Sequence, residues 1–310
     1  MNSRRNFLKK SSLITLGAFN YNFAPIIKNI NGVDISVITY SFNPRSENMN
    51  VIIQNCIDSG TDNIELMGNH LESSLGIPRS KRLISDWRAN VSMKLFRDAK
   101  KIFKDHDINI FAFKSNCISK NNSDEEIEYA MKVTKNLGAD FLTNELMNDE
   151  SVDRVNFYAE KYNVNVGYHT HSNNFGSNVK ATDTAWDYAL NSSKKNYINL
   201  DIGHYINVGG NNTKEALLEF IKKNNKRICS LHLKDRQFGK SANLLASDNQ
   251  IWGNGDTPII EVLKLMRDKS YKFSATIELE YRIPEGSNRV KEVKKCMDYC
   301  IRALNSWLNE

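Results

Sequence analysis

Histidine and acidic side chains gather in four short segments in the second half of the sequence. Residues 167–171 read Gly-Tyr-His-Thr-His, residues 199–204 read Asn-Leu-Asp-Ile-Gly-His, residues 231–236 read Leu-His-Leu-Lys-Asp-Arg, and residues 277–281 read Ile-Glu-Leu-Glu-Tyr. Four of the six histidines of the chain lie in the first three segments. Imidazole and carboxylate groups together suit a divalent metal such as Mn, Co, Zn, Fe or Mg. An open site of this kind polarises a hydroxyl or carbonyl oxygen, so the pattern predicts a metal-assisted enzyme.

Each of these segments lies at the end of a short apolar run that is typical of a β-strand. Side chains alternate between the two faces of a strand, so His169 and His171 share a face, as do Glu278 and Glu280. A single histidine or glutamate at a strand end is more often a hydrogen-bonded structural group than a ligand. Convergence from several strands favours a metal site, and the spacing leaves open which member of each pair binds.

Eight β-branched or aromatic runs alternate with amphipathic helical segments from Asp34 onward, which predicts a parallel α/β fold. Eight parallel strands close a (β/α)8 TIM barrel, in which the chemistry lies at the carboxyl ends of the strands. We therefore predict a single-domain barrel over residues 34–310. The predicted strands are Ile35–Ser41, Asn63–Met67, Ile108–Lys114, Asp140–Asn144, Asn165–His169, Tyr197–Asp201, Ile228–Leu233 and Phe273–Leu279.

Capping residues and apolar periodicity predict several of the connecting helices. An open, doubly wound sheet is the competing architecture, but no Gly-x-Gly-x-x-Gly follows the first strand, where a dinucleotide fold would carry one. The predicted helices include Asp124–Leu137, Lys214–Lys223, Ile259–Lys269 and Val290–Leu308.

The longest irregular stretch, Arg236–Asp256, follows the seventh strand on the side where a barrel keeps its catalytic loops. It is a candidate lid or substrate wall. Trp252 lies within it and is a candidate sugar contact, whereas Trp186 lies in a helical pattern and is predicted to belong to the core.

The first 24 residues have the layout of an export signal, with a basic start, a short apolar stretch and no acidic residue. Within them, Ser-Arg-Arg-Asn-Phe-Leu-Lys at residues 3–9 resembles the twin-arginine pattern, which marks export of a folded protein. We predict a signal segment at residues 1–24, a linker at 25–33, and a mature protein that is periplasmic or otherwise exported. No other stretch approaches the roughly 18 to 20 uninterrupted apolar residues of a membrane span.

The formal charge of +6 hints at an acidic partner, but the leader carries four of the basic residues and no acid. The charge therefore gives little reason to expect a nucleic acid partner, and no membrane partner is expected after removal of the leader. The five cysteines show no C-x-x-C or metal-finger spacing, and an odd number cannot all pair within one chain. Cys296 and Cys300 lie four residues apart on a predicted helix and are predicted to be buried apolar side chains.

Together these motifs make the sequence resemble the sugar phosphate isomerase/epimerase family with the xylose-isomerase-like barrel, across roughly Ile35–Asn309. In epimerases of that family a Glu, an Asp, a His and a second Glu from the last four strands hold the metal. By motif, the resemblance assigns Asp201, His232 and Glu278 to three of these places. It also implies substrate contacts for His204, Lys234 and Arg236, with His171, Glu280 and Trp252 as further candidates.

The sequence departs from the family at the fifth strand, where His169 or His171 stands in place of the first Glu. A symmetric two-glutamate epimerisation is therefore not expected, but a histidine still moves protons near neutral pH. The resemblance implies a divalent metal cofactor (Mn, Co, Zn or Mg) held by His169 and the three residues above. Glu278, His169 and His204 are the candidate catalytic groups for proton transfer next to a carbonyl.

Because sugar phosphates are largely cytoplasmic, export favours a free or keto sugar as the substrate. We therefore predict a sugar isomerase or epimerase. A 3-keto-glycoside lyase that works by β-elimination is the alternative, and a non-catalytic sugar-binding protein is a third. Metal-dependent apurinic endonucleases share this barrel, but they need more histidine and acidic ligands than these strand ends offer.

Overall fold

The computed structural model describes residues 29–147, 149–175, 184–239 and 248–306. The predicted signal segment at residues 1–24 lies outside the described residues, as do residues 25–28 of the predicted linker. No helix of the described ranges is long and apolar enough to cross a membrane.

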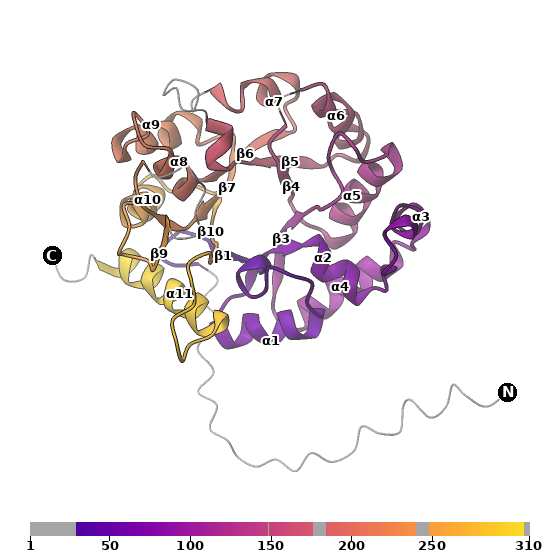
Figure 1. The fold of residues 1–310 in the computed structure, drawn as a ribbon, viewed down its shortest axis with the longest axis horizontal. Coiled ribbons are helices and arrows are strands. Elements are labelled where there is room, and N and C mark those ends of the chain that lie inside the picture. The colour runs from indigo at the N-terminus through magenta and orange to yellow at the C-terminus, as the bar shows by residue number, and fades with distance from the viewer. Residues whose placement is uncertain (1–28, 148, 176–183, 240–247, 307–310) are drawn as a thin grey trace, which may run out of the picture.

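Eight parallel strands close into a barrel in the order β1-β10-β7-β6-β5-β4-β3-β2, and the helices form a ring around them (Figure 1). Closure confirms the predicted TIM barrel and shows that the open-sheet alternative is wrong. All eight predicted strands are present, with ends that differ by a few residues. The barrel strands are β1 (Ile35–Ile38), β2 (Asn63–Met67), β3 (Asn109–Lys114), β4 (Phe141–Glu145), β5 (Asn165–His169), β6 (Asn196–Asp201), β7 (Ile228–Leu233) and β10 (Ser274–Ile277).

Barrel strands are covered on the outside by helices and filled on the inside by side chains, so both faces are buried. This explains why β1 and β7 are buried along their whole length. The interior is not purely apolar: the hydroxyl of Ser36 lies 2.7 Å from that of Ser274 and 2.8 Å from that of Thr276. These small polar residues satisfy one another and so tolerate burial.

Local capping signals determine where several helices begin and end. At α5, Ser123 and Glu126 form a reciprocal capping box, and Gly138 ends the helix in the left-handed conformation. Three of the helices predicted from sequence match within a residue, and the last ends three residues early. The helices are α1 (Met49–Ser59), α2 (Gly68–Ser74), α3 (Ile84–Asn90), α4 (Lys94–Asp105), α5 (Asp124–Leu137), α6 (Ser151–Tyr162), α7 (Asp187–Ser192), α8 (Ile202–Val208), α9 (Lys214–Asn224), α10 (Ile259–Asp268) and α11 (Arg289–Asn305).

The helix α11 packs against both α10 and α1, which closes the outer ring as predicted (Figure 1). All five cysteines are buried free thiols, and burial raises the pKa of Cys296, one of the pair on α11, to about 12. They therefore act as small apolar side chains, as the sequence predicts for Cys296 and Cys300.

The stretch predicted to be irregular after β7 contains a short antiparallel ribbon. Here β8 (Asp235–Arg236) pairs with β9 (Asn249–Gln250), while residues 240–247 lie outside the described part. The Asp235 carboxylate accepts hydrogen bonds from the backbone N–H groups of Gly253 and Gly255, at 2.8 and 3.0 Å. A Cβ at Gly255 would lie 2.3 Å from Asp235 Oδ1, so only glycine permits this close approach. The described part of the stretch is thus tied to the end of β7.

Candidate metal centre

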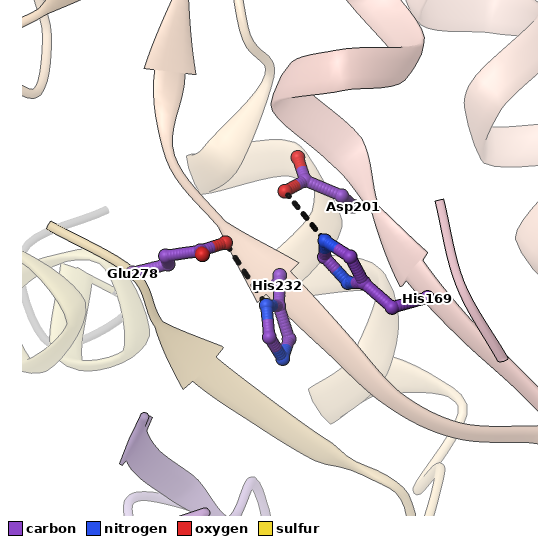
Figure 2. Close-up of side chains that lie close together, drawn as sticks. All are labelled: His169, Asp201, His232 and Glu278. Carbon is purple, nitrogen blue, oxygen red and sulfur yellow. Dashed lines mark hydrogen bonds and ion pairs between the residues drawn. The ribbon is translucent and has the colours of Figure 1, made fainter. Parts of the chain in front are cut away.

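Four neighbouring barrel strands bring together His169, Asp201, His232 and Glu278. His169 ends β5, Asp201 ends β6, His232 lies near the end of β7, and Glu278 directly follows β10. Each residue offers one ligand atom, and these atoms lie within 4.8 Å of one another. All four side chains are buried, and Figure 2 shows them pointing toward one another. The structure thus converges the four residues for which a metal role was predicted.

The turn from β6 into α8 orients Asp201. Its Oδ1 accepts a hydrogen bond from the backbone N–H of His204 at 2.8 Å and caps the helix. Its other oxygen, Oδ2, faces the cluster, 3.9 Å from His169 Nε2. Gly203 permits this tight entry, because a Cβ there would lie 2.3 Å from Lys234 Cγ. One carboxylate therefore serves both as helix cap and as candidate ligand.

The donor set fits a divalent metal. Two imidazoles and two carboxylates suit the borderline transition ions, which take ligands at about 2.0–2.2 Å, so opposite ligand atoms lie about 4 Å apart. The 4.8 Å spread of the four ligand atoms is close to that value. The Nδ1 atom of His169 is buried and has no hydrogen-bond partner among the described residues, an arrangement that is costly unless a ligand completes it.

The Lys234 ammonium group lies directly beside this cluster. Its Nζ is 2.9 Å from Asp201 Oδ2, 2.9 Å from Glu278 Oε2 and 2.8 Å from Glu280 Oε2. Burial disfavours the charged lysine, but Asp201 and Glu278 outweigh burial and raise the pKa of Lys234 well above its ordinary value. Lys234 therefore stays protonated and supplies a fixed positive charge in the site.

Two of the histidines are held neutral. Burial lowers the pKa of His169 well below its ordinary value, and the positive charge of Lys114 acts in the same direction. Burial likewise lowers the pKa of His204, and Lys234 adds to that effect. A neutral imidazole carries a lone pair that accepts a proton or binds a metal.

His232, the second histidine of the four-residue cluster, is favoured in its charged form. Burial disfavours the charged form of His232, but Glu65 and Glu278 outweigh burial and raise its pKa to about 10. Burial also disfavours the Glu278 carboxylate, yet Lys234 and His232 hold its pKa well below the usual range. Burial raises the pKa of Asp201 to about 6, and Lys234 opposes this shift. Without a metal, the site is thus a network of charged pairs.

Four of the six residues predicted to contact substrate lie beside the cluster: His204, Lys234, Arg236 and Glu280. His204 Nδ1 is 2.8 Å from a guanidinium nitrogen of Arg236 and 2.9 Å from the hydroxyl of Ser172. His204 Nε2 is 3.3 Å from Lys234 Nζ. His204, Lys234 and Arg236 therefore form one buried group, with Glu280 joined through Lys234.

The structure separates His169 from His171, two residues that the spacing could not distinguish. Only His169 belongs to the four-residue cluster, while His171 Nδ1 lies 3.0 Å from Glu145 Oε2 and its side chain is 44% exposed. The two rings remain neighbours, with centroids 4.9 Å apart. A second candidate ligand group consists of Glu145, His169 and His171. Lys114 is not a member of this group, but its Nζ lies 2.7 Å from Glu145 Oε1.

The two tryptophans lie in different surroundings. Trp252 packs edge-on against Tyr299 of α11, with ring centroids 5.7 Å apart. Trp186 is buried and donates a hydrogen bond to the backbone oxygen of Tyr168, which confirms its predicted place in the core.

Sequence reasoning missed three charged residues on the first half of the barrel: Glu65 on β2, Lys114 on β3 and Glu145 on β4. Glu65 Oε2 lies 2.7 Å from His232 Nε2. A charged residue inside an otherwise apolar strand is the signal that could have found Glu65, because burial of a charge requires a partner. Lys114 and Glu145 end their strands, as the predicted residues do.

The comparisons with known proteins agree on the barrel. A family model described as a xylose isomerase-like TIM barrel matches residues 53–302. No curated protein matches the chain in sequence. Three solved structures, each 17% identical, resemble it in fold alone. The first is the probable 3-DHS dehydratase AsbF from Bacillus anthracis; the match covers 85% of this chain and 97% of that chain, with a TM-score of 0.62. The second is a sugar phosphate isomerase/epimerase from Parabacteroides distasonis; the match covers 87% of this chain and 94% of that chain, with a TM-score of 0.59. The third is the IolI protein with a bound zinc atom; the match covers 89% of this chain and 99% of that chain, with a TM-score of 0.61.

Proposed function

The chain belongs to the xylose isomerase-like TIM barrel family, and on that basis we propose that it is a divalent-metal-dependent enzyme that moves a proton next to the carbonyl of a free or keto sugar. The family supports enzymatic activity, and the sugar-related neighbours support a small-molecule sugar substrate. The observation that carries the proposal is the convergence of His169, Asp201, His232 and Glu278 at one end of the barrel. Sugar binding alone does not require such a donor set.

A divalent ion held by these four residues would polarise a carbonyl or hydroxyl oxygen of the substrate. The protein supplies the remaining chemistry. The Lys234 ammonium stabilises negative charge that develops on an enediolate oxygen. His232 Nδ1 and Lys234 Nζ both lie 2.9 Å from Glu278 Oε2, so Oε1 is the oxygen left to take the proton from carbon. Return of that proton to the neighbouring carbon, with transfer of the adjacent hydroxyl proton to the former carbonyl oxygen, completes an isomerisation.

A β-elimination is the second candidate reaction. It is favoured by the different chemistry of the two candidate bases, a carboxylate and an imidazole. Glu278 is a carboxylate on one side of the cluster. His169 on the other side is a neutral imidazole whose Nδ1 has no hydrogen-bond partner in the part of the chain that the structure describes. An imidazole that takes a proton from carbon can deliver the same proton to a departing oxygen. A 3-keto-glycoside would then lose its aglycone.

The two reactions are distinguished by incubating the Mn²⁺-loaded protein with free ketoses and with a 3-keto-glucoside. Interconversion of ketoses supports the isomerase, and aglycone release without interconversion supports the lyase. If the protein holds no metal and the Glu278→Ala variant binds sugar as the wild type does, the non-catalytic sugar-binding alternative replaces both.

Metal binding is expected to depend on pH because the His232 pKa is raised to about 10 in the metal-free protein. Below that pKa the ring carries a proton that must leave before Nδ1 can bind a metal. We expect the affinity for Mn²⁺ to rise about tenfold per pH unit between about pH 7 and 8.5, with one proton released per ion. Calorimetry in buffers of different ionisation enthalpy measures both the affinity and the number of protons released. An affinity that is flat over this range would contradict the assignment of His232 as a ligand.

We also propose that residues 1–24 export the protein, which favours a free or keto sugar over a sugar phosphate. The support is the paired Arg4 and Arg5 in an acid-free leader. Replacement of both arginines by lysine is expected to leave the protein in the cytoplasm, as cell fractionation would show. Unchanged export of this double variant would contradict a twin-arginine route.

A further inference from the structure

Glu65 is a fully buried carboxylate that the proposed reaction does not use. It lies in the middle of β2, and its side chain is 0% exposed. In the barrel, β1 and β10 stand between β2 and β7, so the contact of Glu65 with His232 crosses the barrel interior. Burying a carboxylate is costly unless it is paired and hydrogen-bonded, so its partners indicate its role.

Both oxygens of the Glu65 carboxylate are held. Oε1 accepts a hydrogen bond from the hydroxyl of Thr143 on β4, and Oε2 lies 2.7 Å from His232 Nε2. Thr143 is itself fully buried. Two contacts from different strands leave the carboxylate little freedom to turn, so its Oε2 stays directed at the imidazole.

The two nitrogens of His232 consequently face different groups. Nε2 faces Glu65, and Nδ1 faces the candidate metal centre, 2.9 Å from Glu278 Oε2. An imidazole that donates one N–H to a carboxylate presents the lone pair of its other nitrogen to a metal, and the carboxylate determines which nitrogen that is.

We propose that Glu65 is a positioning residue of the metal centre, which holds the Nε2–H of His232 so that Nδ1 binds the metal. The inference rests on the proposed function, because it requires that the cluster hold a divalent ion. Loss of such an outer carboxylate typically weakens metal binding by about 10- to 100-fold.

The test compares Glu65→Gln with wild type in the metal-free, full-length protein, using calorimetric titration with Mn²⁺. Glutamine keeps the shape of the side chain and removes the charge. Glu72→Gln is the matched control, because Glu72 is another buried glutamate, whose carboxylate pairs with Arg88 at 2.8 Å. We expect Glu65→Gln to bind Mn²⁺ about 10- to 100-fold more weakly, and the control to bind as wild type does.

Equal Mn²⁺ affinity of Glu65→Gln and wild type would overturn the inference and leave the proposed function intact. Absence of Mn²⁺ binding by wild type would overturn both. Nitrogen NMR of the Zn²⁺-loaded wild type, with labelled histidine, keeps the inference falsifiable if Glu65→Gln does not fold. We expect His232 to bind through Nδ1 with a proton on Nε2, and ligation through Nε2 would overturn the inference.

Discussion

Replacement of Glu278 by glutamine is expected to lower turnover by about 10²- to 10⁴-fold, the usual contribution of a general base. The carboxylate is buried, and its pKa is held well below the usual range, so at neutral pH it is ionised, which is the form that a general base requires. Glutamine has a similar shape and still offers Lys234 an oxygen, but it cannot take a proton. Turnover should be measured at saturating Mn²⁺ with whichever sugar reacts in the incubations described under Proposed function.

The matched control is Glu292→Gln on α11. Glu292 is also a buried glutamate, and its carboxylate accepts a hydrogen bond from Tyr281 at 2.8 Å, outside the metal cluster. This variant tests whether loss of any buried negative charge slows the enzyme. Metal content must be determined for both variants because Glu278 is also a candidate ligand. A metal-saturated Glu278→Gln protein with turnover within tenfold of wild type would exclude Glu278 as the base.

Replacement of Lys234 by methionine is expected to destabilise the metal-free protein by about 3–5 kcal/mol, the usual cost of removing one partner from a buried ion pair. Lys234 lies within 2.9 Å of three carboxylates, and two of them, Asp201 and Glu278, are candidate metal ligands. Without the ammonium, these buried charges repel one another. A divalent ion supplies the missing charge, so Mn²⁺ is expected to restore most of the lost stability and to bind this variant more tightly.

Urea unfolding with EDTA and with Mn²⁺ measures the effect of Lys234→Met on the free energy of unfolding. Lys161→Met is the control, because the exposed Lys161 pairs with Glu128 at the surface, where ion pairs contribute little. A Lys234→Met protein that Mn²⁺ stabilises no more than it stabilises wild type would contradict competition between the ammonium and the metal for the same carboxylates.

The barrel was predictable because its signals are local. The strand patterns recur along the chain, and caps such as Ser123 mark helix starts within a few residues. Strand ends were less predictable: the first strand stops at Ile38, where a short 3-10 turn (Thr39–Ser41) replaces the expected extension. The stretch Arg236–Asp256 after β7 was predicted to be irregular because strands of two residues, such as β8 and β9, carry too little sequence pattern to detect.

The candidate metal residues were also predictable in type, since strand ends of a barrel meet at one face. Their division of roles was not. Alternation gives His169 and His171 the same face, and only the closed barrel shows that His169 joins the four-residue cluster while His171 pairs with Glu145. Trp252 shows the same limit, because its place in a loop did not reveal its packing on α11.

The sequence by itself determined the eight-strand barrel and the residue types that gather at its carboxyl ends, because strand period, helix caps and the alternation of strands and helices along the chain are local properties. Only the tertiary structure decided that Glu65 meets His232 across the barrel, 167 residues away, and that Lys234 lies among the candidate ligands. Such contacts depend on how the strands stagger when the barrel closes. No local pattern encodes that stagger, so the charge balance of the site emerges only in the folded chain.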